Sequence, residues 1–206
     1  MVARIEKAVV SGVFSLDGQD FDVDNNVWLV GDDAEVLVID APHDAAPIVE
    51  AIAGRRVTAI VLTHGHNDHI TAAVALREAT GAPIWFNPAD RMLWDQVYVA
   101  VHPGAAPDEE LTEGTTFQVA GTTLTALSTP GHSPGSTCLY AQDLGTVFTG
   151  DTLFCGGPGA TGRSYSDHPT ILESIRTRLL TLPGETVVRT GHGDDTTIAA
   201  ETSTLA

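Results

Sequence analysis

Residues 64–69, which read His-Gly-His-Asn-Asp-His, are the feature that most constrains what this chain can fold into. The apolar and β-branched run over residues 57–62 stands before them and predicts a buried strand. A stretch of helical composition follows them and ends at Gly81, a residue type that commonly terminates helices. The segment is therefore predicted to lie between a strand and a helix, where a rigid scaffold often carries a functional site.

Four side chains of this segment offer imidazole nitrogen or carboxylate oxygen, which are ligands that Zn²⁺ prefers. His64 and His66 are two residues apart on an extended stretch, so both are expected to lean towards one ion from the same side. Asp68 and His69 fall where the helix is expected to begin, so the chain turns between the two pairs. We therefore predict that Asp68 and His69 bind a second ion nearby.

Three further candidate ligands each follow a predicted strand. His132 comes after Leu-Ser-Thr-Pro-Gly, Asp151 after Val-Phe-Thr-Gly, and His192 after Val-Val-Arg-Thr-Gly. Loops at strand ends are where rigid sheets display chemical groups. We therefore expect these residues to converge with residues 64–69 on one rim, although they lie far apart in the sequence.

Hydrophobic periodicity and turn residues predict two strand-rich halves. The first half is expected to have strands over residues 6–14, 26–30, 35–39 and 57–62, and helices over 44–53, 70–80 and 87–99. The second is expected to have strands over 116–120, 122–128, 137–141, 146–149 and 186–189, an amphipathic helix over 169–182 and a short final helix. Residues 101–114 and 156–167 are expected to be loops. This order favours an α/β fold of two facing sheets with helices on both outer faces, in one domain spanning residues 1–206.

The charge of the chain limits its expected partners. Asp and Glu number 27 against 10 Lys and Arg, which gives a formal net charge of −17. Such a field repels polyphosphate backbones and anionic lipid, so we expect neither nucleic acid nor membrane as a partner. Residues 1–10 contain no apolar stretch of the length of a secretory signal, and the two cysteines make no disulfide framework. We therefore expect a cytoplasmic protein that acts on a small molecule.

Four short signatures together resemble the glyoxalase II (hydroxyacylglutathione hydrolase) branch of the metallo-β-lactamase superfamily, in its short single-domain bacterial form. They are His64-x-His66-x-Asp68-His69, Gly131-His132-Ser133, Gly150-Asp151-Thr152 and Gly191-His192-Gly193. The resemblance covers residues 25–197 and implies a four-layer αββα sandwich of two facing mixed sheets, without a separate C-terminal substrate domain.

The resemblance also implies a role for each candidate ligand. His64, His66 and His132 match the ligands of a first metal, and Asp68, His69 and His192 match the ligands of a second. Asp151 matches the carboxylate that bridges the two ions. Asp40, which follows the strand predicted over residues 35–39, is similar to the family's supporting acidic residue behind the site.

A site of this kind is expected to catalyse hydrolysis. Coordination lowers the pKa of water from about 15.7 to about 7, so a hydroxide bridging two Zn²⁺ ions is the expected nucleophile. Asp68 and Asp151 are expected to hold the ions that carry it, and Fe or Mn are alternative metals. A thiolate leaving group needs little protonation, and the resemblance points to thioesters of a small cellular thiol. We therefore predict a binuclear metallohydrolase of the thioesterase type.

Substrate contacts are expected in the loop after Asp151, where Phe154, Arg163, Tyr165 and His168 stand among glycines that allow close approach. Relatives often have Gly-Arg-x-Asp here, whereas this chain has Gly-Arg-Ser-Tyr, with Tyr165 at the acidic position. Glutathione-using enzymes of this branch also resemble the chain but add a helical substrate domain after the position of His192, where this sequence has only fourteen residues. Both departures favour another thiol carrier, such as mycothiol.

Three other functions stay open at this point. Persulfide dioxygenases resemble this sequence too, and use one Fe²⁺ held by residues that match His64, His132 and Asp151. A lactonase would use a binuclear site of the same kind, with assistance from Tyr165. A metal-binding scaffold without catalytic activity is the alternative outside enzymes. Metal analysis and a panel of substrates would separate these functions.

Overall fold

The structure of the chain is a computed structural model that describes residues 3–16, 19–162 and 164–205. The chain divides into two compact units, and unit 1 comprises Met1–Leu111 and Val119–Gly121. Unit 2 comprises Thr112–Gln118 and Thr122–Ala206. Among the described residues, no helix has the length and apolar character needed to cross a membrane. The single domain expected over residues 1–206 stays a prediction.

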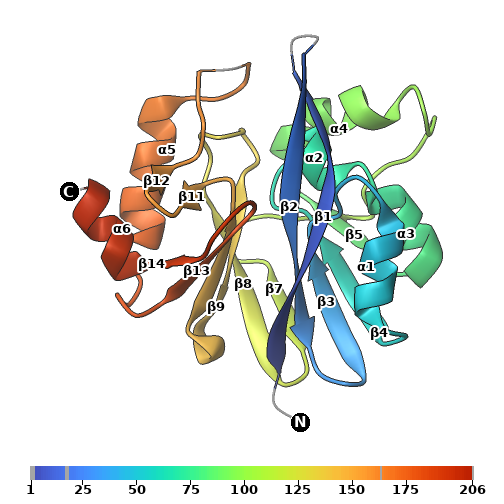
Figure 1. Ribbon diagram of the computed structural model, residues 1–206, viewed down its shortest axis with the longest axis horizontal. Helices are drawn as coiled ribbons and strands as arrows, with labels where there is room; N and C mark the ends of the chain where they lie inside the picture. The colour runs from blue at the N-terminus through green and yellow to red at the C-terminus, as the bar shows by residue number, and fades with distance from the viewer. Residues whose placement is uncertain (1–2, 17–18, 163, 206) are drawn as a thin grey trace. The chain divides into compact units, whose positions relative to one another are not determined.

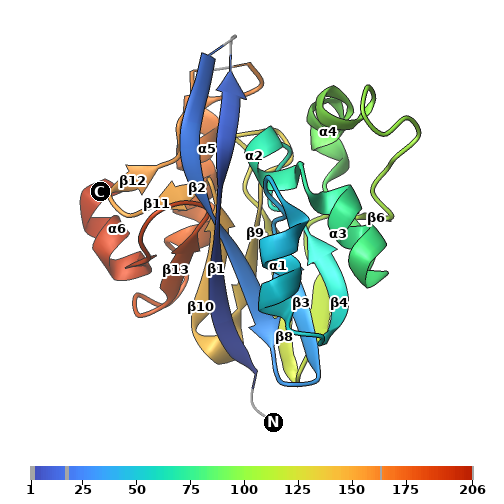
Figure 2. The same ribbon diagram turned by 45° about the vertical axis from the view of Figure 1, so that its right-hand side comes forward.

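Unit 1 contains a six-stranded mixed sheet in the order β1-β2-β3-β4-β5-β6. The pairs β1–β2 and β2–β3 are antiparallel, and β3, β4, β5 and β6 run parallel to one another. β1 and β2 pair along their whole length and form a long twisted hairpin (Figure 1, Figure 2). The elements are β1 (Arg4–Leu16), β2 (Gln19–Gly31), β3 (Glu35–Ile39), α1 (Ala45–Ile52), β4 (Arg56–Val61), α2 (Asn67–Ile70), α3 (Ala73–Thr80), β5 (Ile84–Phe86), α4 (Arg91–Tyr98) and β6 (Glu109–Glu110).

Helices α1 and α3 contact each other beside the unit 1 sheet and close its core (Figure 1). Asp44 begins α1 as an N-cap by accepting a hydrogen bond from Ala46 N at 2.9 Å. Gly81 ends α3 with a φ of 72°, a conformation that glycine adopts without steric cost. Burying each large apolar side chain stabilises the fold by roughly 1.5–3 kcal/mol. The core contains Val38, Ile48, Ile60, Leu76 and Trp94, among others.

The single helix predicted over residues 70–80 is wrong at its start, because two helices, α2 and α3, meet at Thr71 and Ala72. Ala72 N donates to Ala41 O at 2.9 Å, and Ala41 N donates to His69 O at 2.9 Å. These bonds tie the end of α2 to the loop after β3 instead of to a further helical turn. The interruption is a tertiary effect, and it fixes the backbone of His69.

Two strands of unit 1 differ from the prediction in extent. β2 extends the strand predicted over residues 26–30 back to Gln19, because β1 provides a pairing partner at every position. β6 lies inside the stretch 101–114 that was predicted to be a loop, and Glu109 and Glu110 pair with β5. The local sequence of β6 is acidic and has no strand pattern, so its strand character comes from its neighbour.

Unit 2 contains the second six-stranded mixed sheet, in the order β14-β13-β10-β9-β8-β7 (Figure 1). β10 runs parallel to β13 and antiparallel to β9. A separate two-stranded sheet, β11 with β12, follows directly after β10. The elements are β7 (Thr116–Val119), β8 (Thr122–Ser128), β9 (Thr137–Ala141), β10 (Thr146–Gly150), β11 (Leu153–Phe154), β12 (Gly157–Pro158), α5 (His168–Ser174), β13 (Val187–Thr190), β14 (Thr196–Thr197) and α6 (Ile198–Leu205).

Helix α5 is the amphipathic helix predicted for the second half. Asp167 caps it, and hydrogen bonds from the hydroxyl and backbone amide of Thr170 hold the pKa of Asp167 below its usual value. The helix continues into a π-helical turn over Ile175–Leu179, where Leu180 N donates to Ile175 O at 2.9 Å. Its apolar side packs with the strands and α6. This core contains Cys138, Val147, Ile171, Leu179, Val188 and Ile198.

These two mixed sheets with their helices confirm the predicted α/β fold class. The candidate ligands also follow strands as predicted: His64 follows β4, His132 follows β8, Asp151 follows β10 and His192 follows β13. A strand held in a sheet has a fixed end, so each of these loops starts from a rigid position.

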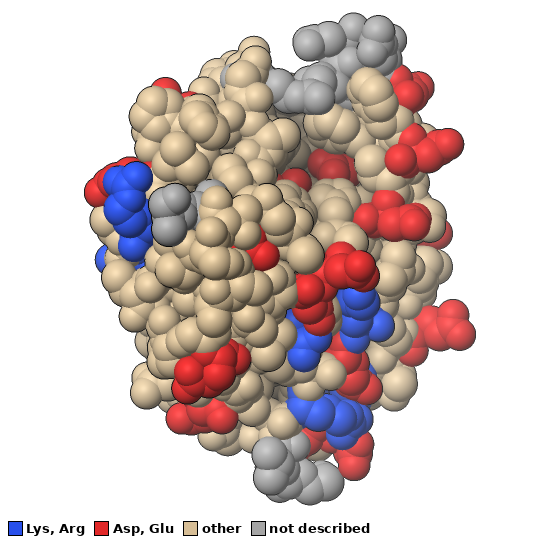
Figure 3. All heavy atoms as spheres, turned by 60° about the vertical axis from the view of Figure 1, so that its left-hand side comes forward, with Lys and Arg blue, Asp and Glu red and all other residues tan. Residues whose placement is uncertain are grey.

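The basic side chains of the described residues are engaged within the fold. Lys7 lies over the ring of Trp28, with its nitrogen 5.4 Å from the ring centroid. Figure 3 shows basic side chains lying against acidic ones on the face that it draws. Each arginine in the described ranges pairs with a carboxylate: Arg4–Asp33, Arg55–Glu6, Arg56–Glu35, Arg77–Asp108, Arg91–Asp95, Arg176–Glu173, Arg178–Glu113 and Arg189–Asp195.

Tyr98 offers a test of how unit 1 holds α2. Its buried hydroxyl bonds Ile70 O and Thr71 O and accepts from Val74 N at 3.3 Å, and burial raises its pKa to about 12. Tyr98→Phe leaves buried backbone groups without this partner, so we expect it to lower the free energy of unfolding by about 1–3 kcal/mol in urea titrations. Tyr165→Phe, at an exposed ring, should change it by less than about 0.5 kcal/mol. Equal stabilities of the two variants would contradict this role.

Candidate metal centre

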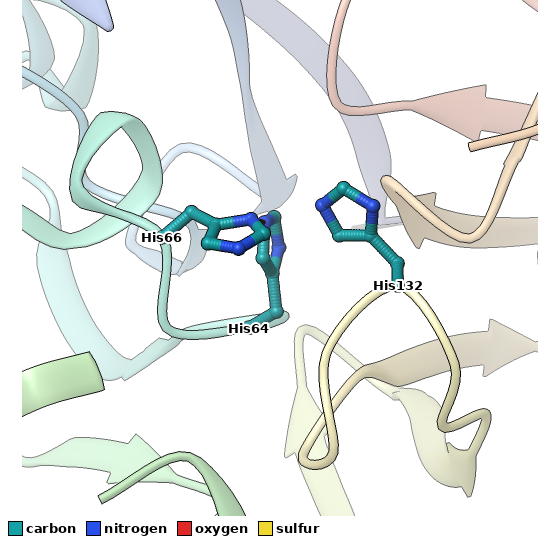
Figure 4. Close-up of side chains that lie close together, drawn as sticks. All are labelled: His64, His66 and His132. Atoms are coloured by element: carbon teal, nitrogen blue, oxygen red, sulfur yellow. Dashed lines mark hydrogen bonds between the residues drawn. The ribbon is translucent and has the colours of Figure 1, made fainter. Parts of the chain in front are cut away.

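The His64 and His66 side chains project from the loop that follows β4. Figure 4 shows them on this loop, and shows His132 on the loop that follows β8. His64 Nε2 lies 3.0 Å from His66 Nδ1, so the two rings present nitrogen atoms to each other as predicted for ligands of one ion. His64 is buried and His66 is half-buried.

Asp40 decides which nitrogen atoms of this loop and of α2 carry protons. Its carboxylate accepts from Thr63 N at 2.7 Å, from Thr63 Oγ1 at 2.9 Å and from His69 Nδ1 at 2.9 Å. Because the Thr63 hydroxyl donates its one proton to Asp40, it accepts from His64 Nδ1, which lies 3.2 Å away. Both histidines are therefore protonated on Nδ1 and keep Nε2 as a lone-pair donor for a cation.

Asp40 is the buried residue predicted behind the site, and its backbone is unusual. It follows the last residue of β3 and has a φ of 65°, a left-handed conformation that non-glycine residues rarely adopt. The residue is 2% exposed, and its carboxylate accepts three hydrogen bonds from Thr63 and His69. These contacts keep the residue in a conformation that is unfavourable by itself.

Asp68 and His69 lie on α2 as the second pair of donors. Asp68 Oδ2 is 3.7 Å from His69 Nε2. Asn25 Nδ2, on β2, lies 3.3 Å from each of these two atoms. Asp68 is 5% exposed and His69 is fully buried, so both are held by the fold and not by solvent.

Asn25 and Asp90 are contacts of this half of the site that the sequence did not reveal. Asp90 is fully buried and accepts from Gly65 N at 2.8 Å, which fixes the backbone between His64 and His66. A Cβ on Gly65 would lie 2.7 Å from the Leu93 side chain, so the central residue of the motif must be glycine. Asp90 follows a predicted helix start, where an acidic residue is common at the surface, so nothing local marked it as buried.

Unit 2 brings its three predicted ligands together. Asp151 Oδ2 lies 3.7 Å from His132 Nε2 and 3.5 Å from His192 Nε2. The three residues come from three different strand ends in one sheet. A carboxylate between two imidazoles suits a divalent cation, because each group offers an atom that Zn²⁺ binds.

His132 is oriented by the backbone of unit 2. Its Nδ1 donates to Ala160 O at 2.8 Å, which leaves the lone pair of the ring on Nε2. A Cβ on Gly159 would lie 1.8 Å from Asp151 O, so only glycine lets this loop pass Asp151. Gly131, before His132, has a φ of 134°, and a Cβ there would meet Ile171 N at 2.3 Å. The two glycines permit the close approach that positions this ligand.

The loop that carries His192 is held by side chains of β13, the strand that precedes it. Thr190 Oγ1 donates to His192 O at 2.6 Å and contacts Asp194 O at 3.2 Å. Arg189 and Asp195 form an ion pair across the same loop. These contacts hold the loop by its backbone and leave the imidazole of His192 facing Asp151.

The predicted substrate-contacting residues lie in different surroundings. Phe154 is on β11, and its ring centroid is 6.2 Å from that of His192. Tyr165 is 50% exposed and has a φ of 71°, and such exposed strained residues are common at binding sites. His168 is exposed at the start of α5 and its Nδ1 is 3.1 Å from Thr161 Oγ1. Arg163 lies outside the described residues.

The two cysteines have different environments. Cys138 is fully buried in β9, and burial raises the pKa of its thiol to about 11, so it stays protonated at neutral pH. Cys155 is exposed. Neither observation marks a cysteine as the nucleophile.

Asp40→Asn tests the proton arrangement of unit 1. The amide would place a donor against His69 Nδ1 and so move the ring proton to Nε2, where the cation should bind. We expect zinc affinity, measured by competition with a chromophoric chelator, to fall about 10- to 100-fold. Asp44→Asn is the matched control, because asparagine also caps α1 well. Zinc affinity equal to that of the unmodified protein in Asp40→Asn would show that Asp40 does not orient the ligands.

Comparison with known proteins gives this geometry a family. A family model described as metallo-beta-lactamase superfamily matches residues 21–192, a range that contains all seven candidate donors. Hydroxyacylglutathione hydrolase GloC of Haemophilus influenzae is 32% identical over 188 residues, which cover 85% of this chain and 89% of that protein.

Solved structures agree with this match. The BLEG-1 B3 metallo-beta-lactamase has a TM-score of 0.79 and 29% identity, over 94% of this chain and 97% of that one. TTHA1623 in a di-iron-bound form has a TM-score of 0.78 and 32% identity, over 88% and 94% of the two chains. The family model covers more than half of the chain, and the fold and the order of the donors agree with it, so the chain belongs to the metallo-β-lactamase superfamily.

Proposed function

We propose that the chain is a binuclear metal-dependent hydrolase that cleaves the thioester of a small thiol. The observation that carries the proposal is that three of the candidate histidines carry their proton on Nδ1 and so keep the lone pair of Nε2 for a cation. Asp40 and Thr63 leave Nε2 of His64 and His69 as acceptors, and Ala160 O does the same for His132. This arrangement supports a metal site, because each hydrogen bond to Nδ1 fixes the ring proton there and leaves Nε2 able to bind a metal.

The two sets of donors are proposed to form one centre. His64, His66 and His132 would hold a first Zn²⁺, Asp68, His69 and His192 would hold a second, and Asp151 would bind both. The family model supports this assignment because its match extends from before His64 to His192. Two divalent ions, when bound, act as Lewis acids and lower the pKa of water to about 7.

We propose that other side chains of the protein balance the charge of the cations and bind the substrate. Asp68 and Asp151 would be the carboxylates that bind the cations, and their negative charge would offset part of the positive charge. Phe154, beside His192, offers an apolar surface for the acyl group, and Tyr165 and His168 offer polar atoms at the edge of the same loop. Arg163 would supply a positive charge for a substrate carboxylate.

The thioester substrate is supported by relatives. GloC, which carries the name hydroxyacylglutathione hydrolase, is similar over most of both chains. A thiolate is a good leaving group, so the chain needs no strong general acid, which agrees with donors that are all committed to cations. We propose a low-molecular-weight thiol such as glutathione or mycothiol as the carrier, and action in the cytoplasm.

A second candidate function is persulfide oxidation at iron. The similarity to TTHA1623, whose structure holds two irons, favours iron as a metal that this donor set accepts. A persulfide dioxygenase would need only His64, His132 and Asp151 on one Fe²⁺. Metal content and oxygen consumption distinguish it from the hydrolase.

The proposal is tested with purified protein, its metal-stripped form and the Asp151→Asn variant. Each is assayed on hydroxyacyl thioesters, a lactone, a β-lactam and a thiol persulfide, with elemental analysis of the same samples. We expect two zinc ions per chain and thioester hydrolysis that falls about 100-fold or more without metal, because several kcal/mol of transition-state stabilisation are lost. Asp143→Asn, at an exposed acid, is the matched control and should keep full activity.

Two results would contradict the proposal. Full thioesterase activity in the metal-stripped protein would exclude the metal-dependent mechanism. One iron per chain, with oxygen consumption on the persulfide, would replace the hydrolase with the dioxygenase.

A further inference from the structure

A series of hydrogen-bonded side chains leads from Asp68 and His69 through Asn25 to His43, a histidine outside the proposed metal centre. His43 Nε2 lies 2.7 Å from Asn25 Oδ1. Asn25 Nδ2 lies 3.3 Å from Asp68 Oδ2 and 3.3 Å from His69 Nε2. Asn25 is fully buried on β2, and His43 is half-buried in the loop between β3 and α1.

The chemistry of the partners fixes the orientation of the Asn25 amide. A carboxylate accepts only, and His69 Nε2 accepts because Nδ1 of the same ring donates to Asp40. The amide nitrogen of Asn25 must therefore face these two atoms, since its oxygen would meet two acceptors there. The amide oxygen then points to His43, which must donate from Nε2. Each of these hydrogen-bonded side chains therefore has one consistent assignment of donors and acceptors.

Gly12 on β1 provides the space for His43. A Cβ built on Gly12 would lie 2.2 Å from His43 Cγ and 2.3 Å from His43 Nδ1. Glycine inside a strand is unfavourable by roughly 0.5–1 kcal/mol relative to alanine, so a reason for it is expected. His43 itself has a φ of 50°, a strained conformation for a residue with a side chain. The strand and the loop are both adapted to seat this imidazole.

We propose that His43 and Asn25 are positioning residues for the second metal ion, with Gly12 as the residue that lets His43 reach its place. His43 holds the Asn25 amide in one orientation, and the amide holds the Asp68 carboxylate. An ion on His69 Nε2 takes the lone pair that accepts from Asn25 here, so Asp68 is the ligand that the amide positions. The inference rests on the proposed function, in that it takes Asp68 and His69 as ligands of the second ion. It adds residues that contact neither the ion nor the substrate.

The prediction concerns zinc bound at a fixed, low concentration of free zinc, measured by elemental analysis and by competition with a chelator. We expect the full chain to bind two ions. Asn25→Leu and His43→Ala should bind the first ion with unchanged affinity and the second about 10- to 100-fold more weakly. His43→Gln keeps a donor for Asn25 and should restore most of the affinity.

Gly12→Ala tests the same contact without removing a polar group. We expect it to weaken the second ion, because the new methyl group displaces His43. In a Gly12→Ala, His43→Ala double variant, the methyl group should add no further loss, since the side chain it displaces is gone. Ser11→Ala is the matched control, because its hydroxyl bonds the exposed Asp24 at 2.6 Å and is one residue away on the same strand.

The outcomes separate the inference from the proposed function. If the unmodified chain binds two ions and Asn25→Leu binds the second equally well or more tightly, the positioning role is wrong and the binuclear centre stands. If the losses in the double variant add, Gly12 acts through the strand and not through His43, which also overturns the proposal. If the unmodified chain binds only one ion, the binuclear centre itself fails. Should Asn25→Leu not fold, the cycle of Gly12 and His43 variants decides.

Discussion

The carboxylate of Asp40 is the contact on which the metal-binding half of unit 1 depends. It accepts directly from His69 Nδ1, and through the Thr63 hydroxyl it also sets the proton of His64. One buried acid thus decides the tautomer of a ligand from each of the two pairs. The loop after β4 leads directly into the short helix α2, and Asp40, at the end of β3, accepts hydrogen bonds from both. A site built from neutral imidazoles needs such an anchor, because either ring nitrogen would otherwise carry the proton.

In unit 2 the protonated nitrogen of a histidine is set by the backbone instead of by a buried acid. His132, a proposed ligand, is oriented by a backbone carbonyl, and the loops around Asp151 depend on glycines that permit close approach. Replacing one polar side chain leaves these backbone contacts in place. Replacing Asp40 or Asn25, in contrast, removes the contact itself. Variants of the two units should therefore affect metal binding through different routes.

The sequence predicted the strands, the fold class and the seven donors because these have local signals. A buried strand is an apolar run, and a histidine or aspartate directly after it is visible as a change of residue type. Asp40 was accessible only through resemblance to a family. Asn25, His43 and Asp90 were not found, because their roles depend on contacts with residues distant in the chain. Gly12 lies inside the strand predicted over residues 6–14, and only the position of His43 explains a glycine there.

The most direct test of the central claim is anomalous diffraction from crystals grown with zinc, recorded at the zinc absorption edge. The account predicts two peaks per chain, one contacted by His64, His66 and His132 and the other by Asp68, His69 and His192, with Asp151 touching both. A single peak, or peaks whose ligands all come from one unit, would contradict it.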